Sequence, residues 1–317
     1  MKRTLCLILT LALLLLSACS TQPAQEPSST TPEPSSRQES VCTPVLYKVS
    51  AENGAVLYLF GSIHATDSRA YPLPDYVMQA YEASDYLAVE CDVNAFSKDF
   101  AAQKELAAKM VLMDGTTVAD HLGQDVYAAA KSFLSSRGEY FQIYDSYHPA
   151  MWMSLMEAAV VDMCGLDANN GIDMYFLTLA AQEGKQIREV ESVEYQYNVL
   201  LGFSDELLSL IVGDSAQDPQ AQADGTLALY EDWLAGDEEK LIAQFNEQPE
   251  DAAEAALYEE YQQALVTQRN LQMTDTAEEY LKQGGTGFFV VGAAHILGDG
   301  ACADLLAERG YTVERVG

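Results

Sequence analysis

Basic residues are scarce in this chain. Its 317 residues include 17 lysines and arginines against 48 aspartates and glutamates, which gives a formal net charge of −31 at pH 7. A field of that sign repels nucleic acid and anionic lipid headgroups, so nucleic acid is excluded as a partner. The acidic residues are spread along predicted solvent-facing helices, a pattern that favours solubility over a dedicated store of cations.

Several motifs of familiar enzyme classes are also missing. The chain has no His-Glu-x-x-His helix, which excludes a zincin-type protease, and no Gly-x-Ser-x-Gly, which argues against an α/β-hydrolase. Gly284-Gly285-Thr-Gly287 lacks the lysine of a phosphate-binding loop and is typical of a turn that enters a strand. Any hydrolytic chemistry must therefore come from other residues.

Cysteine is infrequent, and its spacing fits neither a zinc knuckle nor a Cys-x-x-Cys redox pair. Cys6 and Cys19 belong to the N-terminal segment considered next. The remaining cysteines are Cys42, Cys91, Cys164 and Cys302. They allow two disulfides in any of three pairings, or four thiols, and the sequence does not choose between these alternatives.

The chain opens with an export signal. Lys2 and Arg3 precede an apolar run over residues 5–16, which has the length of a signal peptide and is short for a bilayer span. The run ends in Leu16-Ser17-Ala18-Cys19, which resembles the lipobox of bacterial lipoproteins. We predict a signal peptide over residues 1–18 and acylation of Cys19. The protein is then exported and lipid-anchored to the bacterial membrane, with its domain outside the cytoplasm.

Residues 19–40 are predicted to form a disordered tether. From Ser20 to Ser40 the chain is almost entirely Ser, Thr, Pro, Gln and Glu, with no aliphatic residue larger than alanine. Such a segment cannot bury enough surface to offset the entropy lost on ordering. The rest of the sequence contains no second linker of this kind, so residues 41–317 are predicted to form one domain.

The apolar pattern of that domain predicts an α/β or α+β fold. Two β-prone runs, residues 45–50 and 56–61, flank Asn53-Gly54, a pair that tolerates the positive φ angles of a hairpin turn. Further strands are predicted over residues 86–90, 186–190, 287–291 and 311–316. Helices are predicted over 75–83, 221–282 and 300–309, and over most of 95–212, where the strand 186–190 follows a helix over 171–183. N-terminal and C-terminal strands must then build one core sheet, with a large helical insertion between them.

Two matching phrases lie far apart in the chain. They are Leu57-Tyr-Leu-Phe-Gly61-Ser-Ile-His64 and Phe288-Phe-Val-Val-Gly292-Ala-Ala-His295. In each, glycine lets the backbone turn where a strand leaves the sheet, and histidine lies at the carboxyl end of that strand. Ligands bind at this edge of open α/β sheets. The repeated context predicts that His64 and His295 act in one site, whereas His121 and His148 are predicted to cap helices or lie on the surface.

Two acidic residues are expected at the same edge. Glu90 and Glu191 each follow a predicted strand, where a carboxylate is buried unless it meets a cation, a metal ion or a proton. The structural alternative to a catalytic role is a salt bridge. The arginines that could supply it are Arg69, Arg188 and Arg269.

Together these phrases resemble the TraB/GumN family over residues 44–316. The resemblance rests on a set of short phrases in a fixed order: the two Gly-x-x-His phrases, Leu87-Ala-Val-Glu90, Gly171-Ile-Asp173 leading to Ala180 and Gly184-Lys185, Glu191-Ser with Gln196, Arg269-Asn270, and the Gly298-x-Gly300 that follows His295. The family includes pheromone-shutdown and plasmid-transfer proteins. It is similar to the animal Tiki proteases, which are metal-dependent and use two Gly-x-x-His motifs with acidic residues, and more distantly to erythromycin esterases and haem-regulated ChaN lipoproteins.

The resemblance implies a hydrolase-like site. Its implied catalytic residues are His64, Glu90, Glu191 and His295, and its ligand-binding residues are Gly61, Gly292 and Arg269. A divalent ion, Mn²⁺, Co²⁺ or Zn²⁺, is expected to be held by His64, His295 and Glu90 and to lower the pKa of a bound water. The expected activity is that of a metal-dependent peptidase acting on peptides or proteins at the cell surface.

Two alternatives stay open at this point. In one, His64 acts on water as a general base without a metal ion, and Glu90 or Glu191 orients it, as the esterase resemblance implies. In the other, the chain is a tethered binding protein that holds a peptide or haem without turning it over. Chelation separates the first alternative from the metal-dependent enzyme, and product formation separates the second from both.

Overall fold

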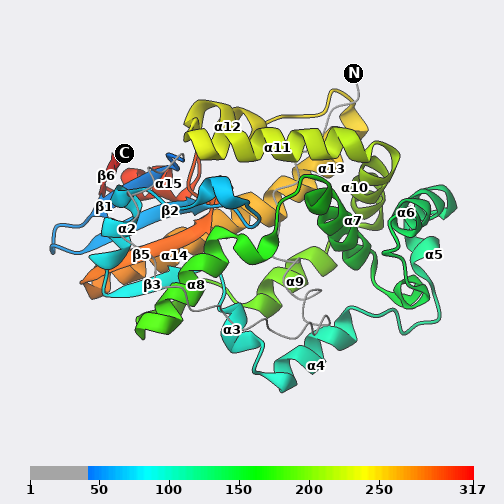
Figure 1. Ribbon diagram of the computed structural model, residues 1–317, viewed down its shortest axis with the longest axis horizontal. Helices are drawn as coiled ribbons and strands as arrows, with labels where there is room; N and C mark the ends of the chain where they lie inside the picture. Colours follow the sequence, from blue (N-terminus) through cyan, green and yellow to red (C-terminus); the bar gives the residue numbers. More distant parts are fainter. Residues whose placement is uncertain (1–41) are drawn as a thin grey trace, which may run out of the picture.

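The structure is a computed structural model that describes residues 42–317, so the predicted signal peptide, Cys19 and the tether lie outside the described residues. The described chain forms a six-stranded mixed sheet surrounded by helices, which confirms the predicted α/β class. Figure 1 shows the strands gathered at one end of the molecule and a group of helices at the other.

The sheet has the strand order β4-β3-β5-β2-β1-β6. Strands β1 (Leu46–Ser50) and β2 (Val56–Ser62) form the predicted antiparallel hairpin, with Gly54 at a φ of 87° in its turn. The other strands are β3 (Tyr86–Val89), β4 (Gln186–Glu189), β5 (Thr286–Gly292) and β6 (Thr312–Arg315). Strands β2, β5, β3 and β4 are parallel, whereas β6 is antiparallel to β1.

The two ends of the described chain, residues 42–317, meet in this sheet, as predicted for the domain. Strand β2 pairs with β5 along its whole length, and β1 pairs with β6. In the β2–β5 register, Gly61 lies opposite Val291 and Ser62 lies opposite Gly292. The two Gly-x-x-His phrases therefore leave the sheet side by side at its carboxyl edge.

Most of the chain between the strands is helical. The helices are α2 (Asp75–Glu82), α3 (Val93–Phe96), α4 (Phe100–Lys109), α5 (Val118–Leu122), α6 (Gln124–Ser136), α7 (Pro149–Met163), α8 (Ile172–Glu183), α9 (Val193–Leu201), α10 (Asp205–Gln217), α11 (Pro219–Ala235), α12 (Glu238–Phe245), α13 (Ala252–Gln262), α14 (Gln268–Gln283) and α15 (Cys302–Glu308). Helix α4 stops at Lys109 because Val111 forms a β-bridge with Tyr147 instead of another helical turn. Within residues 42–317, no helix is long and apolar enough to cross a membrane.

Two apolar clusters fill the interior. One packs the sheet against α2, α8, α14 and α15, and at its centre the rings of Phe60 and Phe288 contact Phe176, with centroids 4.8 to 5.9 Å apart. The other lies among α6, α7 and α10 around Trp152. Because the first cluster holds the strands and the start of α8 together, it fixes the edge that carries the two histidine phrases.

The described cysteines are thiols. Cys42, Cys91, Cys164 and Cys302 are not joined by disulfides within residues 42–317. The sequence left two disulfides or four thiols as alternatives, and the structure has the four thiols. The covalent restraint of a disulfide therefore does not contribute to the stability of this part of the chain.

Candidate functional site

His64 follows β2 and is oriented by a buried carboxylate. Its Nδ1 lies 2.8 Å from Oδ2 of Asp173, the second residue of α8, and Ser62 Oγ donates to the other oxygen of Asp173 at 2.9 Å. Asp173 is 5% exposed. With Nδ1 held in this way, the Nε2 atom of His64 is the ring nitrogen left to act on a ligand.

The surroundings of His64 favour its charged form. Burial is the largest effect and opposes the charge, but the charge of Asp173, the hydrogen bond to it and the charge of Glu90 together outweigh burial. They raise the pKa of His64 to about 9. His64 is therefore an imidazolium at neutral pH.

His295 ends the short 3₁₀ turn Ala293–His295. In contrast to His64, its surroundings favour the neutral imidazole. Its Nδ1 lies 2.7 Å from Oδ1 of Asn270, whose Nδ2 donates to the carbonyl of Gly300 at 3.0 Å. The amide oxygen thus faces the ring, so Nδ1 carries the hydrogen and Nε2 carries the lone pair. Burial, followed by the charge of Arg269, lowers the pKa of His295 to about 3.

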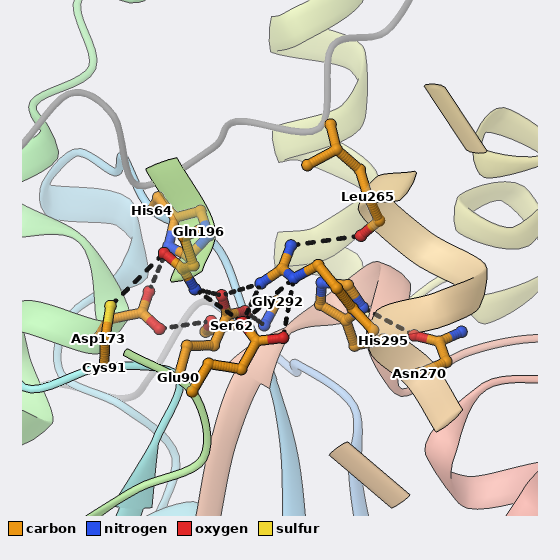
Figure 2. Close-up of polar contacts among 12 residues, drawn as sticks. Ser62, His64, Glu90, Cys91, Asp173, Gln196, Leu265, Asn270, Gly292 and His295 are labelled. Carbon is orange, nitrogen blue, oxygen red and sulfur yellow. Dashed lines mark hydrogen bonds and ion pairs between the residues drawn. The ribbon is translucent and has the colours of Figure 1, made fainter. Parts of the chain in front are cut away.

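The two rings and Glu90 converge on Gly292. A methyl group added to Gly292 would lie 3.3 Å from Oε1 of Glu90, 3.6 Å from Cδ2 of His295 and 3.8 Å from Nε2 of His64. Figure 2 shows His64 with Asp173 on one side of Gly292, and His295 with Asn270 on the other. A side chain at this position would occupy the point where the three groups meet, so glycine keeps the site open.

Glu90 and Glu191 share one arginine. Arg269 donates through Nη2 to Oε2 of both carboxylates at 2.8 Å, and through Nε to Glu191 at 3.0 Å. Gln196 Nε2 also donates to both, at 2.8 and 3.1 Å. Of the three arginines considered from the sequence, Arg269 makes this salt bridge, whereas Arg69 pairs with Asp67 and Arg188 stacks on Tyr86.

Glu90 stays ionised in the interior. Burial alone would raise its pKa, but the positive charge of Arg269 outweighs burial and holds the pKa of Glu90 well below its usual range. The two histidines and the N–H of Gly292, which donates to Glu90 at 2.7 Å, lower this pKa to a smaller extent.

Arg269 and Asn270 are consecutive residues of α14, and a π-helical turn, Gln263–Thr267, directly precedes that helix. One helix start therefore supplies the partner of the carboxylates and the partner of His295.

The other two histidines lie outside this cluster. His148 caps α7, where its Nδ1 accepts from the backbone N–H of Ala150 at 3.2 Å. His121 lies in the last turn of α5 between Asp205 and Thr116. Both positions agree with the capping or surface roles expected from the sequence.

Comparison with known proteins identifies the family. A profile of the TraB/PrgY/gumN family matches residues 45–315. The chain belongs to this family. The match includes every residue of the site described above, from Ser62 to Gly300.

Curated relatives in the TraB/PrgY/gumN family are distant. YbaP of Escherichia coli (strain K12), described as uncharacterized, is 27% identical over 158 residues, which are 49% of this chain and 55% of YbaP. YbaP of Shigella flexneri matches to the same extent. The chain thus spans about half the length of the curated relatives it matches. No solved structure is significantly similar to it.

In this TraB/PrgY/gumN protein, two glycines let backbones approach next to the site. A methyl group on Gly61 would lie 3.1 Å from Cα of Ala293, and the Gly61 carbonyl accepts from Trp233 Nε1 at 2.8 Å. Gly61 therefore packs β2 against the His295 turn, and its ligand-binding role stays a prediction. A methyl group on Gly171, the residue before α8, would lie 2.2 Å from the carbonyl oxygen of His64.

We expect Gly171→Ala to misplace His64. A contact of 2.2 Å must open by roughly 1 Å, which separates Asp173 at the start of α8 from the imidazole and should lower the raised pKa of His64. Imidazole NMR and thermal melting measure the effect. Gly213→Ala is the control, because its new methyl group meets only side chains, at 3.4 Å or more. An unchanged pKa of His64 in Gly171→Ala would show that the Asp173 contact survives the substitution.

The two Nε2 atoms are the atoms best placed to hold a metal ion. An oxygen acceptor holds Nδ1 of each ring, an arrangement that orients imidazole ligands in metal sites. Glu90 fits less well, because both of its oxygens already accept hydrogen bonds. Among residues 42–317, no three His, Cys, Asp or Glu side chains are grouped so that they could hold a metal ion. A metal ion held by the two imidazoles, with or without Glu90, therefore stays a prediction.

Several residues of the site were not singled out from the sequence. Ser62, Asp173, Gln196 and Asn270 appeared only as parts of longer phrases, without a role of their own. Asp173 in the first turn of a predicted helix and Asn270 beside Arg269 were the available clues. Their roles became visible only when α8 and α14 were placed against the sheet.

Proposed function

We propose that this family member hydrolyses peptide bonds at the point beside Gly292 where His64, His295 and Glu90 meet. The observation that carries the proposal is the convergence of His64, His295 and Glu90 on Gly292, with Nδ1 of His64 held by Asp173 and Nδ1 of His295 held by Asn270. The surroundings favour the charged form of His64 and the neutral form of His295. Environments that drive the pKa values of neighbouring groups apart are typical of acid and base partners in catalysis.

The proposal gives each side chain one task. His64 donates a hydrogen bond from Nε2 to the substrate carbonyl oxygen and stabilises the negative charge that develops there. Asp173 keeps that imidazole charged and oriented. His295 accepts a hydrogen bond from the attacking water through the Nε2 lone pair, and the ionised Glu90, which faces the same point, takes the proton of that water. His64 gives its Nε2 proton to the leaving amine as the peptide bond breaks, and the proton held by Glu90 then restores its charge.

The oxygen acceptors on Nδ1 of both rings favour the metal-dependent form over the metal-free one, because such acceptors orient imidazole ligands in metal sites. The neutral His295 has an Nε2 lone pair for a cation, although the nearby positive charge of Arg269 opposes one. Bound to Nε2 of both rings, Mn²⁺, Co²⁺ or Zn²⁺ would supply a water of lowered pKa. His64 must lose its Nε2 proton in that form, because an imidazole ligand is neutral.

The direct test is cleavage of peptides by the purified protein. We expect mass spectrometry of a peptide library to show cleavage products, chelation to abolish them, and Mn²⁺, Co²⁺ or Zn²⁺ to restore them. Activity that survives exhaustive chelation would assign the reaction to the imidazoles without a metal. Peptide or haem binding without products would contradict a hydrolase and support the tethered binding protein.

A further inference from the structure

A small apolar pocket adjoins the two histidines. Its apolar walls are Ile63, Leu229, Trp233, Leu241 and Phe245, and His64 and Gly292 also line it. Its volume is about 30 Å³. A water requires roughly 10 to 15 Å³ of such space, so the pocket has room for one small aliphatic group beside the reacting point.

The walls of the pocket are fixed by contacts outside it. Trp233 donates to the carbonyl of Gly61 at 2.8 Å and stacks on Tyr230, whose hydroxyl donates to Asp67 at 2.9 Å. Leu241 is 1% exposed and Leu229 is 6% exposed. A charged group that entered the apolar part of the pocket would lose its hydration without gaining a partner there.

We propose that this pocket is a specificity subsite that accepts a small aliphatic side chain, of alanine to valine size, next to the bond that is cleaved. The inference rests on the proposed function. Because His64 and Gly292 form part of the pocket, a side chain within it places its own backbone at the point where the two imidazoles converge. Glycine leaves the pocket empty, and the side chain of phenylalanine or lysine has to extend beyond its apolar walls.

Internally quenched peptides that differ only in the residues beside the cleaved bond test the subsite. We expect kcat/KM with alanine or valine to exceed that with glycine, phenylalanine or lysine by at least about tenfold. Leu229→Ala should raise the ratio of kcat/KM for the phenylalanine peptide to kcat/KM for the valine peptide by at least about tenfold. Leu229→Phe should lower the ratio of kcat/KM for the valine peptide to kcat/KM for the glycine peptide. Leu155→Ala, which opens a comparable space in the second apolar cluster, should leave both ratios unchanged.

Two results separate this inference from the proposed function. Cleavage with equal rates across the series, or ratios unaffected by both Leu229 variants, would overturn the subsite and leave the hydrolase intact. If no peptide is cleaved, binding is measured through Trp233 fluorescence in a Trp152→Phe background with N-acetyl amino acid amides. Quenching by the valine amide that Leu229→Phe abolishes would support the subsite, and equal binding of the valine and lysine amides would overturn it.

Discussion

His295→Ala is expected to lower kcat/KM for peptide hydrolysis by at least about a thousandfold. The variant removes the neutral imidazole that lies beside Gly292, and removal of one central catalytic group commonly has an effect of this size. The loss of unfolding free energy should stay near 1–3 kcal/mol, because one buried hydrogen bond to Asn270 is broken.

Steady-state kinetics and chemical denaturation of the same preparations separate the two effects of His295→Ala. His148→Ala is the matched control, because it removes a helix cap outside the site and should leave kcat/KM unchanged. Asn270→Ala should keep the ring but free its orientation, and should therefore reduce the rate less than His295→Ala does. A folded His295→Ala protein with wild-type kinetics would show that the ring is structural.

Arg269→Ala is expected to destabilise the protein by about 3–5 kcal/mol at pH 7. Glu90 and Glu191 would then be left without the cation that compensates their charge in the interior. In the wild type, the lowered pKa of Glu90 contributes stability above its usual pKa, and that stability is lost as the pH falls through the lowered value. The variant lacks this contribution, so the difference between the two proteins should shrink as the pH falls from about 4.5 towards about 2.

Denaturant unfolding of Arg269→Ala at several pH values measures this difference. Lys109→Ala breaks the exposed pair with Glu194 and should change stability by less than about 1 kcal/mol. Replacing Glu90 and Glu191 by glutamine in the Arg269→Ala background should recover part of the loss. No recovery in that triple variant would mean that lost packing, rather than unpaired charge, destabilises Arg269→Ala.

The local patterns of the sequence were sufficient to predict the strands of the sheet, but not their order. Asn53-Gly54 between two β-prone runs predicted the β1–β2 hairpin, and the matching phrases predicted that β2 and β5 leave the sheet together. These features depend on residues close in sequence or on the repeated strand pattern. The hydrogen-bond partners of the two histidines come instead from α8 and α14, and packing between elements distant in sequence brings these helices to the sheet.

The two glycines of the histidine phrases illustrate the same limit. From the sequence they were equivalent, each predicted to bind a ligand. In the structure, Gly292 faces Glu90 and both imidazoles, whereas Gly61 faces the backbone of Ala293. In the β2–β5 pairing, Gly292 lies opposite Ser62 and not opposite Gly61, so the two glycines are offset by one residue. Because successive residues of a strand face opposite sides of the sheet, the two glycines meet different neighbours, and the motif alone does not specify this register.

Imidazole NMR of nitrogen-15-labelled protein across the pH range is the most direct test of the central claim, that His64 and His295 are held in opposite protonation states. The chain has four histidines, and single substitutions assign their signals. We predict that both nitrogens of His64 stay protonated at neutral pH and that the ring titrates near pH 9. We predict that His295 stays neutral, with its hydrogen on Nδ1, until the pH falls to about 3. Two rings that both titrate near pH 6.5 would contradict the account.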